Sequence, residues 1–542
     1  MNQEVVRWGN TVTLGDVRGR SCRNFNPRLR HLGELSVDAR PFADRDYLVQ
    51  GERRLTFGAY ETAVARVADL LVRHGVTPDD RVLILGANSL EWVVSWWSIV
   101  RIGAVAVLGN MWWSPEELAH AIRMAAPVLV LADADHAKVV PPGQSVIQLE
   151  ELGELIKRPP SQANRKWPER DEDDPAVIIF TSGTTGLPKG VVLSHRSLLA
   201  TMHATLERTH RLPVLGTSAS RATKSLISLP LFHVGGLQQI LIPMATGGTL
   251  IFNEGRFDPA KITDLIRNED LDIWSTVPTM VTRVLDYLDD RELEPLASVR
   301  TIGLGGAPVA QRLRARIPQH FPSVARRLAV AYGLSEAGGS VTSAVGDAIL
   351  SRPGTVGLPY ATAEIQILEP DESGTGEVLL RGPFVMLGYM KTPGDGIALD
   401  SQTITEDGWL HTGDVGHIDS DGYLFITDRI KDIVIRGGEN IGTPHVEDNL
   451  LHHPDVREVA VFGLPHPIFG EELAAVVVLR PGSNVNSHEL REFLTSRLAY
   501  FEIPTKWDLR FEPLPHNVTG KILKKELRDH WPNAREVPRN DR

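Results

Sequence analysis

The sequence predicts an α/β fold with more than one domain, and two observations support this prediction. The first is length, because 542 residues exceed what one hydrophobic core usually serves. The second is order: as far as Pro308, short apolar runs of strand type alternate with amphipathic runs of helix type, which is typical of parallel α/β sheets. With 42% apolar and 23% charged residues, the chain can build sizeable cores.

The alternation begins in residues 55–133. Helical spacing follows Thr56, and buried strands are expected over 81–88, in the second half of 91–109 and over 126–133. In the first half of 91–109, three tryptophans, two of them at i, i+4 spacing, predict a core helix; they are Trp92, Trp96 and Trp97. Further apolar runs follow over 176–183, 225–232, 247–253, 271–278 and 299–308. These segments predict a large N-terminal domain of parallel α/β sheets.

The pattern changes from Ala363 onward. Short strands and turns over 363–370, 376–382 and 422–428 predict a small β-rich subdomain. Beyond it, strand-like and helix-like runs over 456–465, 472–482 and 487–498 predict a small mobile α+β C-terminal domain. We place the linker at Asp428 to Asp432. The expected divisions are an N-terminal domain at 1–428, a hinge at 429–432, a C-terminal domain at 433–530 and a loose tail at 531–542.

Charge and cysteine content argue against several classes of function. Lys and Arg number 57 against 68 for Asp and Glu, a net charge of −11, so we expect no nucleic-acid partner. The single Cys22 excludes an intramolecular disulfide and a zinc site of several thiolates. The N-terminus lacks the apolar core of a signal peptide, and no apolar run reaches the roughly eighteen residues of a membrane span. We therefore expect a cytoplasmic protein.

A loop rich in glycine and hydroxyl residues, TSGTTGLPKG at 181–190, follows a strand-like apolar run. It is not a Walker loop, because Lys189 is preceded by proline and followed by glycine. The dinucleotide fingerprint also fails here, and in GLGGAP, where Pro308 takes the last place. Backbone N–H groups and hydroxyls in such a loop can surround a polyphosphate, with Lys189 as a point charge. On composition alone, a surface turn is an equal alternative.

Five motifs occur in order along the chain: TSGTTGLPKG, YGLSE (332–336), HTGD (411–414), DRIKD (428–432) and NVTGK (517–521). From Tyr47 to Leu527 the chain resembles the adenylate-forming superfamily of acyl- and aryl-CoA synthetases, luciferases and peptide-synthetase adenylation domains. It is most similar to bacterial fatty-acyl-CoA synthetases. The resemblance implies an AMP-forming acid–thiol ligase that uses ATP, Mg²⁺ and coenzyme A. Such an enzyme converts a carboxylic acid to an acyl-adenylate with release of pyrophosphate, and then passes the acyl group to CoA.

The resemblance also assigns roles in nucleotide binding. Glu336 would be the Mg²⁺ ligand, and Asp414 would accept hydrogen bonds from the ribose hydroxyls, with Arg429 near the same sugar. Tyr332 would offer a stacking face to the adenine. Taken alone, these charged residues would be interpreted as solvated surface groups. The ATP- and AMP-binding residues implied by the resemblance are Thr181, Ser182, Gly183, Thr184, Thr185, Gly186, Lys189, Gly305, Gly306, Ala307, Pro308, Tyr332, Gly333, Ser335, Asp414 and Arg429.

Lys521 is the principal catalytic residue that the resemblance implies. It would bridge the attacking carboxylate and the α-phosphate, and so stabilise the transition state more than the separated reactants. On residue type alone, it would be one more solvated lysine beside Lys524 and Lys525. Because it belongs to the C-terminal domain, that domain must move between the two half-reactions. Lys431 would be the hinge, and a loop containing Arg436, Gly437 and Gly438 would lie beside the arm of CoA.

The segment LFHVGG at 231–236 bears on the acid substrate. By resemblance, His233 lies near the acyl group and joins Lys521 among the catalytic residues; a histidine satisfied by packing is the alternative. Amino-acid-activating relatives usually carry an aspartate after the phenylalanine, whereas Phe232 is followed here by histidine. We therefore expect an apolar acid, which could be fatty, aryl or polycyclic. The expected acyl pocket comprises His233, Val234, Gly235, Val277, Gly306 and Ala337.

The sequence departs from the family pattern at GGENIGTPHVE, where relatives commonly have GGENIYPAEVE. The altered positions are Gly442, Thr443, Pro444 and His445, and they put the contacts of the thioester-forming pose in question. Trp112 and Trp113 could line a subunit or peripheral membrane contact, so a homodimer is possible. The remaining unusual feature is a set of N-terminal arginines, interpreted as a solvated face or a contact with anionic lipid: Arg18, Arg20, Arg23, Arg28 and Arg30.

Three competing hypotheses remain open. A ligase of the same fold could load the phosphopantetheine of a carrier protein instead of free CoA, and a luciferase-like oxygenase would consume O₂. A catalytically silent nucleotide-binding scaffold is a different class. The presence of Lys521, Glu336 and Asp414 argues against the silent scaffold, because such a protein has no chemical need for all three.

Overall fold

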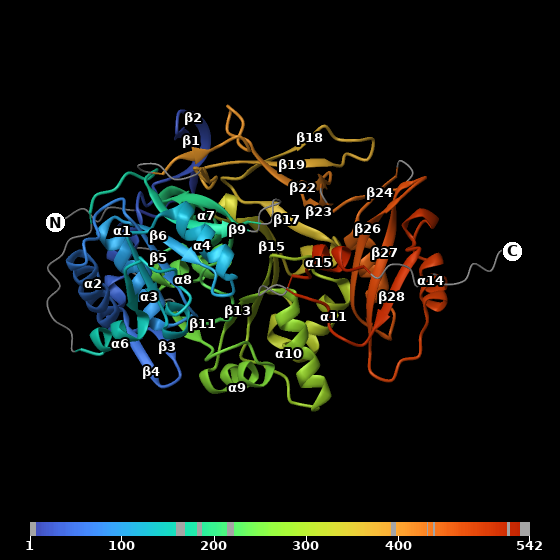
Figure 1. Cartoon of the computed structure of the whole chain (residues 1–542), viewed down its shortest axis with the longest axis horizontal. Helices are drawn as coiled ribbons and strands as arrows, with labels where there is room; N and C mark the ends of the chain where they lie inside the picture. The colour runs from blue at the N-terminus through green and yellow to red at the C-terminus, as the bar shows by residue number, and fades with distance from the viewer. Residues whose placement is uncertain are drawn as a thin grey trace.

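The computed structural model describes residues 7–158, 168–181, 187–213, 222–391, 397–430, 432–436, 439–516 and 521–531. Within these residues the chain forms two large sheets, a smaller C-terminal sheet and an N-terminal hairpin. Figure 1 shows the large sheets at the left and centre and the C-terminal sheet at the right.

The first large sheet has the strand order β21-β20-β10-β9-β6-β5-β7-β8 in the described residues. The strands β5 to β9 run parallel where they pair, whereas β10, β20 and β21 extend the sheet in antiparallel fashion. Their bounds are β5 Arg81–Leu85, β6 Val105–Gly109, β7 Leu129–Ala132, β8 Val146–Gln148, β9 Pro175–Thr181, β10 Lys189–Ser194, β20 Gly388–Met390 and β21 Leu399–Asp400.

The second large sheet has the order β18-β19-β22-β23-β17-β16-β15-β14-β13-β11-β12-β3-β4. The strands from β15 to β3 in this order pair in parallel, and those flanking them pair in antiparallel fashion. The bounds are β3 Asp46–Gln50, β4 Arg53–Thr56, β11 Lys224–Ile227, β12 Thr249–Phe252, β13 Ile273–Thr276, β14 Thr301–Leu304, β15 Leu328–Leu334, β16 Gly339–Val345, β17 Thr355–Pro359, β18 Glu364–Leu368, β19 Gly376–Arg381, β22 Leu410–Ile418 and β23 Leu424–Arg429.

The α/β class is confirmed, but the sheets are not purely parallel. Each has a parallel centre with antiparallel strands added at one or both edges. The β-rich segment predicted after Ala363 contributes β18, β19, β22 and β23, and these strands pair through β17 onto the second sheet. The predicted β-rich segment is therefore an extension of the second large sheet rather than a separate sheet.

Helices pack between and outside the two large sheets. The core between them includes α2, α3, α7 and α8, whereas α4 covers the outer face of the first sheet and α9, α10 and α11 that of the second. The bounds are α1 Leu32–Asp38, α2 Phe57–Arg73, α3 Leu90–Ile102, α4 Pro115–Ala125, α5 Ala134–Ala137, α6 Leu149–Ile156, α7 His195–Arg208, α8 Val234–Thr246, α9 Pro259–Glu269, α10 Pro278–Asp290, α11 Gln311–His320 and α12 Asp347–Ser351, with short 3₁₀ helices η1 Arg40–Phe42, η2 Pro322–Val324 and η3 Ser335–Ala337.

Local sequence explains where the central helices begin. The Thr56 hydroxyl accepts a hydrogen bond from Ala59 N (3.2 Å) at the start of α2, and the Ser89 hydroxyl accepts one from Trp92 N (3.1 Å) at the start of α3. Such caps satisfy N–H groups that have no partner inside the helix. Trp92, Trp96 and Trp97 are fully buried, so the predicted core helix is confirmed.

The C-terminal sheet has the order β25-β24-β27-β26, with β28 paired to β27. α13 and α14 cover one face, and Leu527 of α15 packs on the other; Figure 1 shows α15 on the side nearer the large sheets. The bounds are β24 Val434–Arg436, β25 Glu439–Ile441, β26 Val456–His466, β27 Gly470–Leu479, β28 Lys506–Arg510, α13 Thr443–Leu451, α14 Ser487–Thr495 and α15 Lys524–Asp529, with η4 at Tyr500–Glu502.

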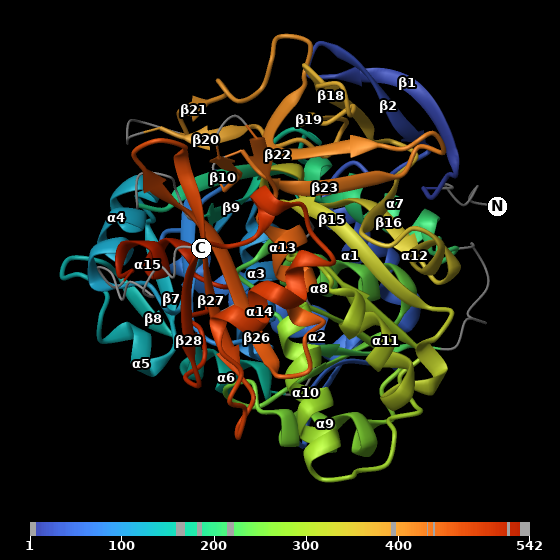
Figure 2. The same cartoon turned by 90° about the vertical axis from the view of Figure 1, so that its right-hand side faces the viewer.

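The remaining element is the hairpin of β1 (Thr11–Val17) and β2 (Arg20–Asn26). Figure 2 shows the hairpin beside β18 and β19, two strands that are remote from it in sequence. None of the described helices is both long and apolar enough to cross a bilayer.

Candidate active site

The carboxyl ends of parallel strands gather the predicted site residues at one edge of the second sheet. Strands β11, β13, β14 and β15 are parallel neighbours. Val277 follows β13, Gly305 to Pro308 follow β14, and Ser335 and Glu336 follow β15. In α/β sheets, ligands bind at this edge. The predicted phosphate loop begins at Thr181, the end of β9 in the first sheet; Ser182, Gly183, Thr184, Thr185 and Gly186 lie outside the described residues.

The proposed ribose position is built from three side chains on strands of the second large sheet. Asp414 on β22 lies opposite Arg429 on β23, and Arg429 Nε is 3.0 Å from Asp414 Oδ1. The Tyr332 hydroxyl on β15 donates a hydrogen bond to Asp414 Oδ2 (2.7 Å). Asp414 is only 4% exposed, so its carboxylate is held in one place. Each carboxylate oxygen can accept more than one hydrogen bond, which leaves acceptor capacity for a sugar diol.

The electrostatics of this group favour the arrangement. Burial, and then the negative charge of Asp414, raises the pKa of Tyr332 well above its ordinary value. The phenol therefore stays protonated and remains a donor at neutral pH. The sequence suggested a stacking ring at Tyr332 but gave no sign that its hydroxyl would hold Asp414.

A second group surrounds Glu336. The hydroxyl of Tyr389 on β20 donates to Glu336 Oε1 (2.7 Å), and Lys189 Nζ lies 5.4 Å from the centre of the Tyr389 ring. Lys189 and Tyr389 come together because β10 and β20 are paired strands. Burial and the Glu336 carboxylate raise the pKa of Tyr389, so this phenol is also a donor. Sequence reasoning missed Tyr389, since a tyrosine in a short apolar run carries no sign of this role.

Glu336 fits the expected Mg²⁺ site. It is only partly buried, and no hydrogen bond from another described residue engages its Oε2. That oxygen could bind a cation, and Mg²⁺ prefers carboxylate, phosphate and water oxygens. The short helix η3 fixes the position of Glu336, and Gly338, with φ 64°, caps this helix. A Cβ on Gly338 would lie 2.8 Å from Ser197 O, so glycine is required there.

His233 lies at the start of α8, in the loop after β11. Asn88 holds that loop, donating from Nδ2 to Leu229 O (2.8 Å) and accepting at Oδ1 from Leu231 N (2.9 Å). His233 Nε2 is buried, and no described residue gives it a hydrogen-bond partner. Burial lowers the pKa of His233 to about 4, so the imidazole is neutral at physiological pH. It offers an unpaired polar atom rather than a positive charge.

Apolar and small residues surround this histidine and the nearby strand ends. The Phe232 ring contacts His233 (4.5 Å between centres) and Trp112 (5.4 Å). Gly306 has φ 77°, and a Cβ built on it would lie 3.6 Å from Val277 Cγ1. Of the other predicted pocket residues, Ala337 is buried, Val234 is partly buried and Gly235 is exposed. Trp113 packs edge-on against Phe180 of β9 (5.3 Å).

Lys521 directly precedes Ile522, which forms an isolated bridge with His516, and it is exposed. The nearby Lys524 is not the solvated lysine that its sequence suggests. Its Nζ lies 2.7 Å from both Thr443 Oγ1 and Glu447 Oε1. Thr443, in turn, donates from N and Oγ1 to Asp428 Oδ2, each at 2.9 Å. This chain of contacts links the Lys521 segment through α13 to β23.

The unusual GTPH sequence has a structural explanation at two positions. Thr443 provides the hydroxyl of the chain of contacts just described. At Gly442, a Cβ would lie 2.9 Å from Thr427 Cγ2, so a larger residue would need the Thr427 side chain on β23 to shift. Lys431, the predicted hinge, and Gly437 and Gly438 of the predicted CoA loop lie outside the described part of the chain.

Arg18, Arg20 and Arg28 do not form the predicted solvated face, because they contact other parts of the chain, whereas Arg23 and Arg30 are exposed. Arg28 and Arg30 form ion pairs with Glu172 at 2.9 and 2.6 Å, and Arg20 Nε donates to Glu406 O (3.0 Å). Arg18 donates to two backbone carbonyls of the 385–386 loop. The sequence did not predict these contacts, because the partners are more than 140 residues away.

Comparison with known proteins identifies the family of this chain. A family model described as "AMP-binding enzyme" matches residues 35–390, and one described as "AMP-binding enzyme C-terminal domain" matches residues 445–521. A feruloyl-CoA synthase of Amycolatopsis sp is 32% identical over 491 residues, covering 88% of this chain and 94% of that protein. A long-chain-fatty-acid–CoA ligase of Mycobacterium tuberculosis is 30% identical over 529 residues, covering 94% and 97%.

Comparison with solved structures also finds similarity to CoA synthetases. An o-succinylbenzoate CoA synthetase of Bacillus subtilis in complex with its acyl-adenylate intermediate has a TM-score of 0.78 at 27% identity, covering 94% of this chain and 99% of that one. The same enzyme in complex with ATP and magnesium has a TM-score of 0.75 at 28% identity, covering 91% and 98%. The expected cofactors ATP, Mg²⁺ and CoA are thus confirmed. The chain belongs to the AMP-binding enzyme family, within the adenylate-forming superfamily that its motifs indicated, and it is an acid–thiol ligase.

Proposed function

We propose that this ligase activates an apolar carboxylic acid as an acyl-adenylate and then transfers the acyl group to CoA. The observation that carries the choice of acid is His233, whose ring nitrogen is neutral, buried and without a described hydrogen-bond partner, and whose ring packs against Phe232. A charged substituent on the acid would be buried there without a counter-charge, at a large energetic cost. An uncharged fatty or aryl group would lose nothing by entering.

Nucleotide binding is proposed to use the two tyrosine-held carboxylates. Asp414, fixed by Tyr332 and Arg429, would accept from the ribose hydroxyls. Glu336, oriented by Tyr389, would hold Mg²⁺, which when bound neutralises phosphate charge during adenylation. Lys189 and the loop that begins at Thr181 would surround the β- and γ-phosphates.

Lys521 is proposed to act at the point where the carboxylate meets the α-phosphate. Two anions must approach there, and a cation that contacts both lowers the barrier by stabilising the charge that develops. After adenylation the same position must admit a thiol. We therefore propose that the segment carrying Lys521 withdraws by rotation about Lys431, in a domain beginning near residue 433, and that Arg436 with Gly437 and Gly438 approaches CoA.

The test is a substrate panel under defined conditions. The protein would be incubated with ATP, Mg²⁺ and fatty, aryl, polycyclic or amino acids, with and without CoA. Pyrophosphate release would be measured, and the products would be identified by mass spectrometry. We expect acid-dependent pyrophosphate release with fatty or aryl acids and an acyl-CoA mass when CoA is present. Preference for an amino acid would contradict the assignment of the pocket. If the adenylate does not react with CoA but acylates the phosphopantetheine of a carrier protein, the acceptor is the carrier protein rather than CoA.

A further inference from the structure

The turn of the N-terminal hairpin holds an arginine where the backbone disfavours it. Val17 pairs with Arg20, so Arg18 and Gly19 form a two-residue turn, with φ values of 55° and 76°. This is the type I′ geometry, which favours Asn-Gly or Gly-Gly because the left-handed region is unfavourable for most residues with a Cβ. An outlier of this kind calls for an explanation in terms of what its side chain does.

The Arg18 side chain contacts a loop that is remote in sequence. Its Nη1 donates to Met386 O (2.9 Å) and its Nη2 to Val385 O (3.0 Å), and the side chain is 22% exposed. The planar guanidinium is suited to such paired bonds, which fix the orientation of both partners. Arg18 therefore holds two successive carbonyl groups of the chain that leads into β20.

The peptide unit between Val385 and Met386 is bonded on both sides. Its carbonyl accepts from Arg18 and from Ser197 Oγ (3.1 Å), and its N–H donates to Glu336 O (2.8 Å). Three residues later, Tyr389 donates to the Glu336 carboxylate. This short segment thus holds Glu336 by its backbone and by its side chain, and Arg18 holds the segment from the opposite side.

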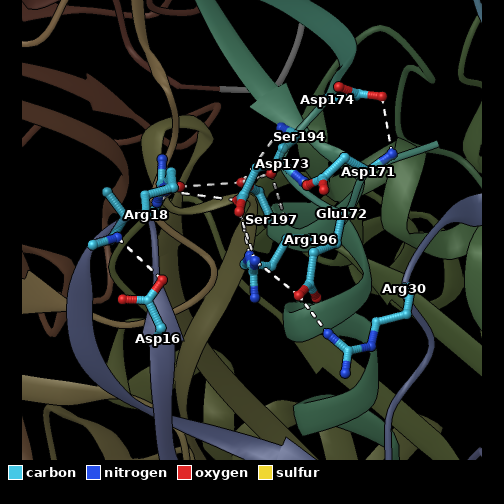
Figure 3. Close-up of polar contacts among 12 residues, drawn as sticks. Asp16, Arg18, Arg30, Asp171, Glu172, Asp173, Asp174, Ser194, Arg196 and Ser197 are labelled. Carbon is cyan, nitrogen blue, oxygen red and sulfur yellow. Dashed lines mark hydrogen bonds and ion pairs between the residues drawn. The ribbon is translucent and has the colours of Figure 1, made fainter.

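The acidic groups beside Arg18 do not depend on it as a counter-ion. Asp173 lies 3.8 Å from Arg18 Nε but takes two closer bonds from Arg196, at 2.8 and 2.6 Å. Glu172 is paired with Arg28, Arg30 and Arg196. Figure 3 shows Arg18, Arg196 and Ser197 converging beside these carboxylates. The carbonyl bonds are therefore the contacts specific to Arg18, and the ion-pair cluster serves to keep the hairpin docked.

We propose that Arg18 is a positioning residue for the Mg²⁺–nucleotide site, acting through the Val385–Met386 peptide on Glu336. The proposal rests on the metal role proposed for Glu336. Residues that orient a metal ligand typically change metal affinity or activity by about 10- to 100-fold when replaced. The N-terminal hairpin is then part of the active-site support rather than a peripheral appendage.

The test uses Arg18→Asn, which suits a type I′ turn and so preserves the hairpin while removing the guanidinium. We expect the Mg²⁺ concentration for half-maximal pyrophosphate release, and the dissociation constant of MgATP measured by calorimetry, to rise about 10-fold. Hydrogen exchange at the Met386 amide should accelerate by about 10-fold in the protein without nucleotide. Arg18→Lys, which keeps one donor, should recover part of each effect. Arg23→Gln, on the exposed face of the same hairpin, is the matched control and should resemble the wild type.

The outcomes separate this inference from the metal role on which it rests. If Glu336→Gln abolishes the Mg²⁺ response while Arg18→Asn leaves Mg²⁺ dependence, MgATP affinity and Met386 exchange unchanged, the inference about Arg18 is wrong and the metal role stands. If Glu336→Gln responds to Mg²⁺ as the wild type does, the metal role itself is wrong. A lower melting temperature of Arg18→Asn with normal Mg²⁺ dependence would show that the arginine only stabilises the fold, which also overturns the inference.

Discussion

Asp414 and Lys521 are both required by the proposed chemistry, yet the chain holds them in opposite ways. Asp414 is almost fully buried, and the side chains of Tyr332 and Arg429 engage both of its oxygens. Lys521 is exposed and lies next to Ile522, which forms an isolated bridge with His516. The difference fits the proposed roles, in which the binding group is buried in the fold and the group that acts at the reacting atoms is on an exposed segment of another region.

The largest effect should follow from removing the mobile cation. Lys521→Ala should lower the rate of adenylate formation by about 10³-fold, because one electrostatic contact to the transition state is lost. MgATP affinity should change by less than about 2-fold, since binding relies on Asp414 and the phosphate loop. Rapid-quench measurement of pyrophosphate, together with calorimetry of MgATP binding, checks both expectations. Normal pyrophosphate release would remove Lys521 from the mechanism.

The opposite pattern is expected at the fixed carboxylate. Asp414→Ala should weaken MgATP binding by about 10- to 100-fold, because hydrogen bonds to a buried charge are lost. At saturating MgATP the rate of adenylation should fall much less. The kcat and KM for ATP separate these effects, and a thermal melt shows whether Tyr332 and Arg429 still pack. An unaltered KM for ATP would count against the ribose role.

A smaller effect should arise from the link between the two regions. Lys524→Met removes the partner of Thr443 and of Glu447, so the segment carrying Lys521 loses its support. Misplacement of a catalytic group should lower the adenylation rate by about 10-fold or more, with MgATP affinity unchanged. The exposed neighbour Lys525 offers the control Lys525→Met. Equal rates in both variants would mean that the link does not position Lys521.

The smallest effect concerns pH at the acyl site. Because burial lowers the pKa of His233 to about 4, the KM for the acid should show no step near the ordinary histidine pKa of about 6.5. A step there that disappears in His233→Asn would contradict the neutral imidazole. As the pH falls, His233 becomes protonated at a higher pH in the unfolded chain than in the folded one. His233 should therefore contribute stability above about pH 6.5 that is lost as the pH falls toward 4.

Sequence patterns predicted the local structure well because their causes are local. Helical spacing after Thr56 predicted α2, and the spacing of Trp92 and Trp96 predicted that α3 is a core helix. The order of strands in the two sheets had no such signal, since pairing joins segments that are hundreds of residues apart.

In the candidate site, too, local sequence patterns identified some residues and missed others. Motifs named Glu336, Asp414 and Arg429, but not Tyr389, which donates to Glu336, or Arg18, which holds the chain leading into β20. These contacts span 53 residues for Tyr389 and 368 for Arg18, and neither residue type marks the role. Lys524 was taken as solvated for the same reason, because its partner Glu447 lies in another element.

The central claim is that the acid is joined to CoA through an acyl-adenylate, and isotope transfer tests it most directly. The preferred acid, labelled with ¹⁸O in both carboxylate oxygens, would be converted to acyl-CoA with excess CoA, ATP and Mg²⁺, and the AMP weighed. If a carboxylate oxygen attacks the α-phosphate and the thiol then displaces AMP, the AMP carries one ¹⁸O. Unlabelled AMP, or ADP with label in inorganic phosphate, would contradict the account.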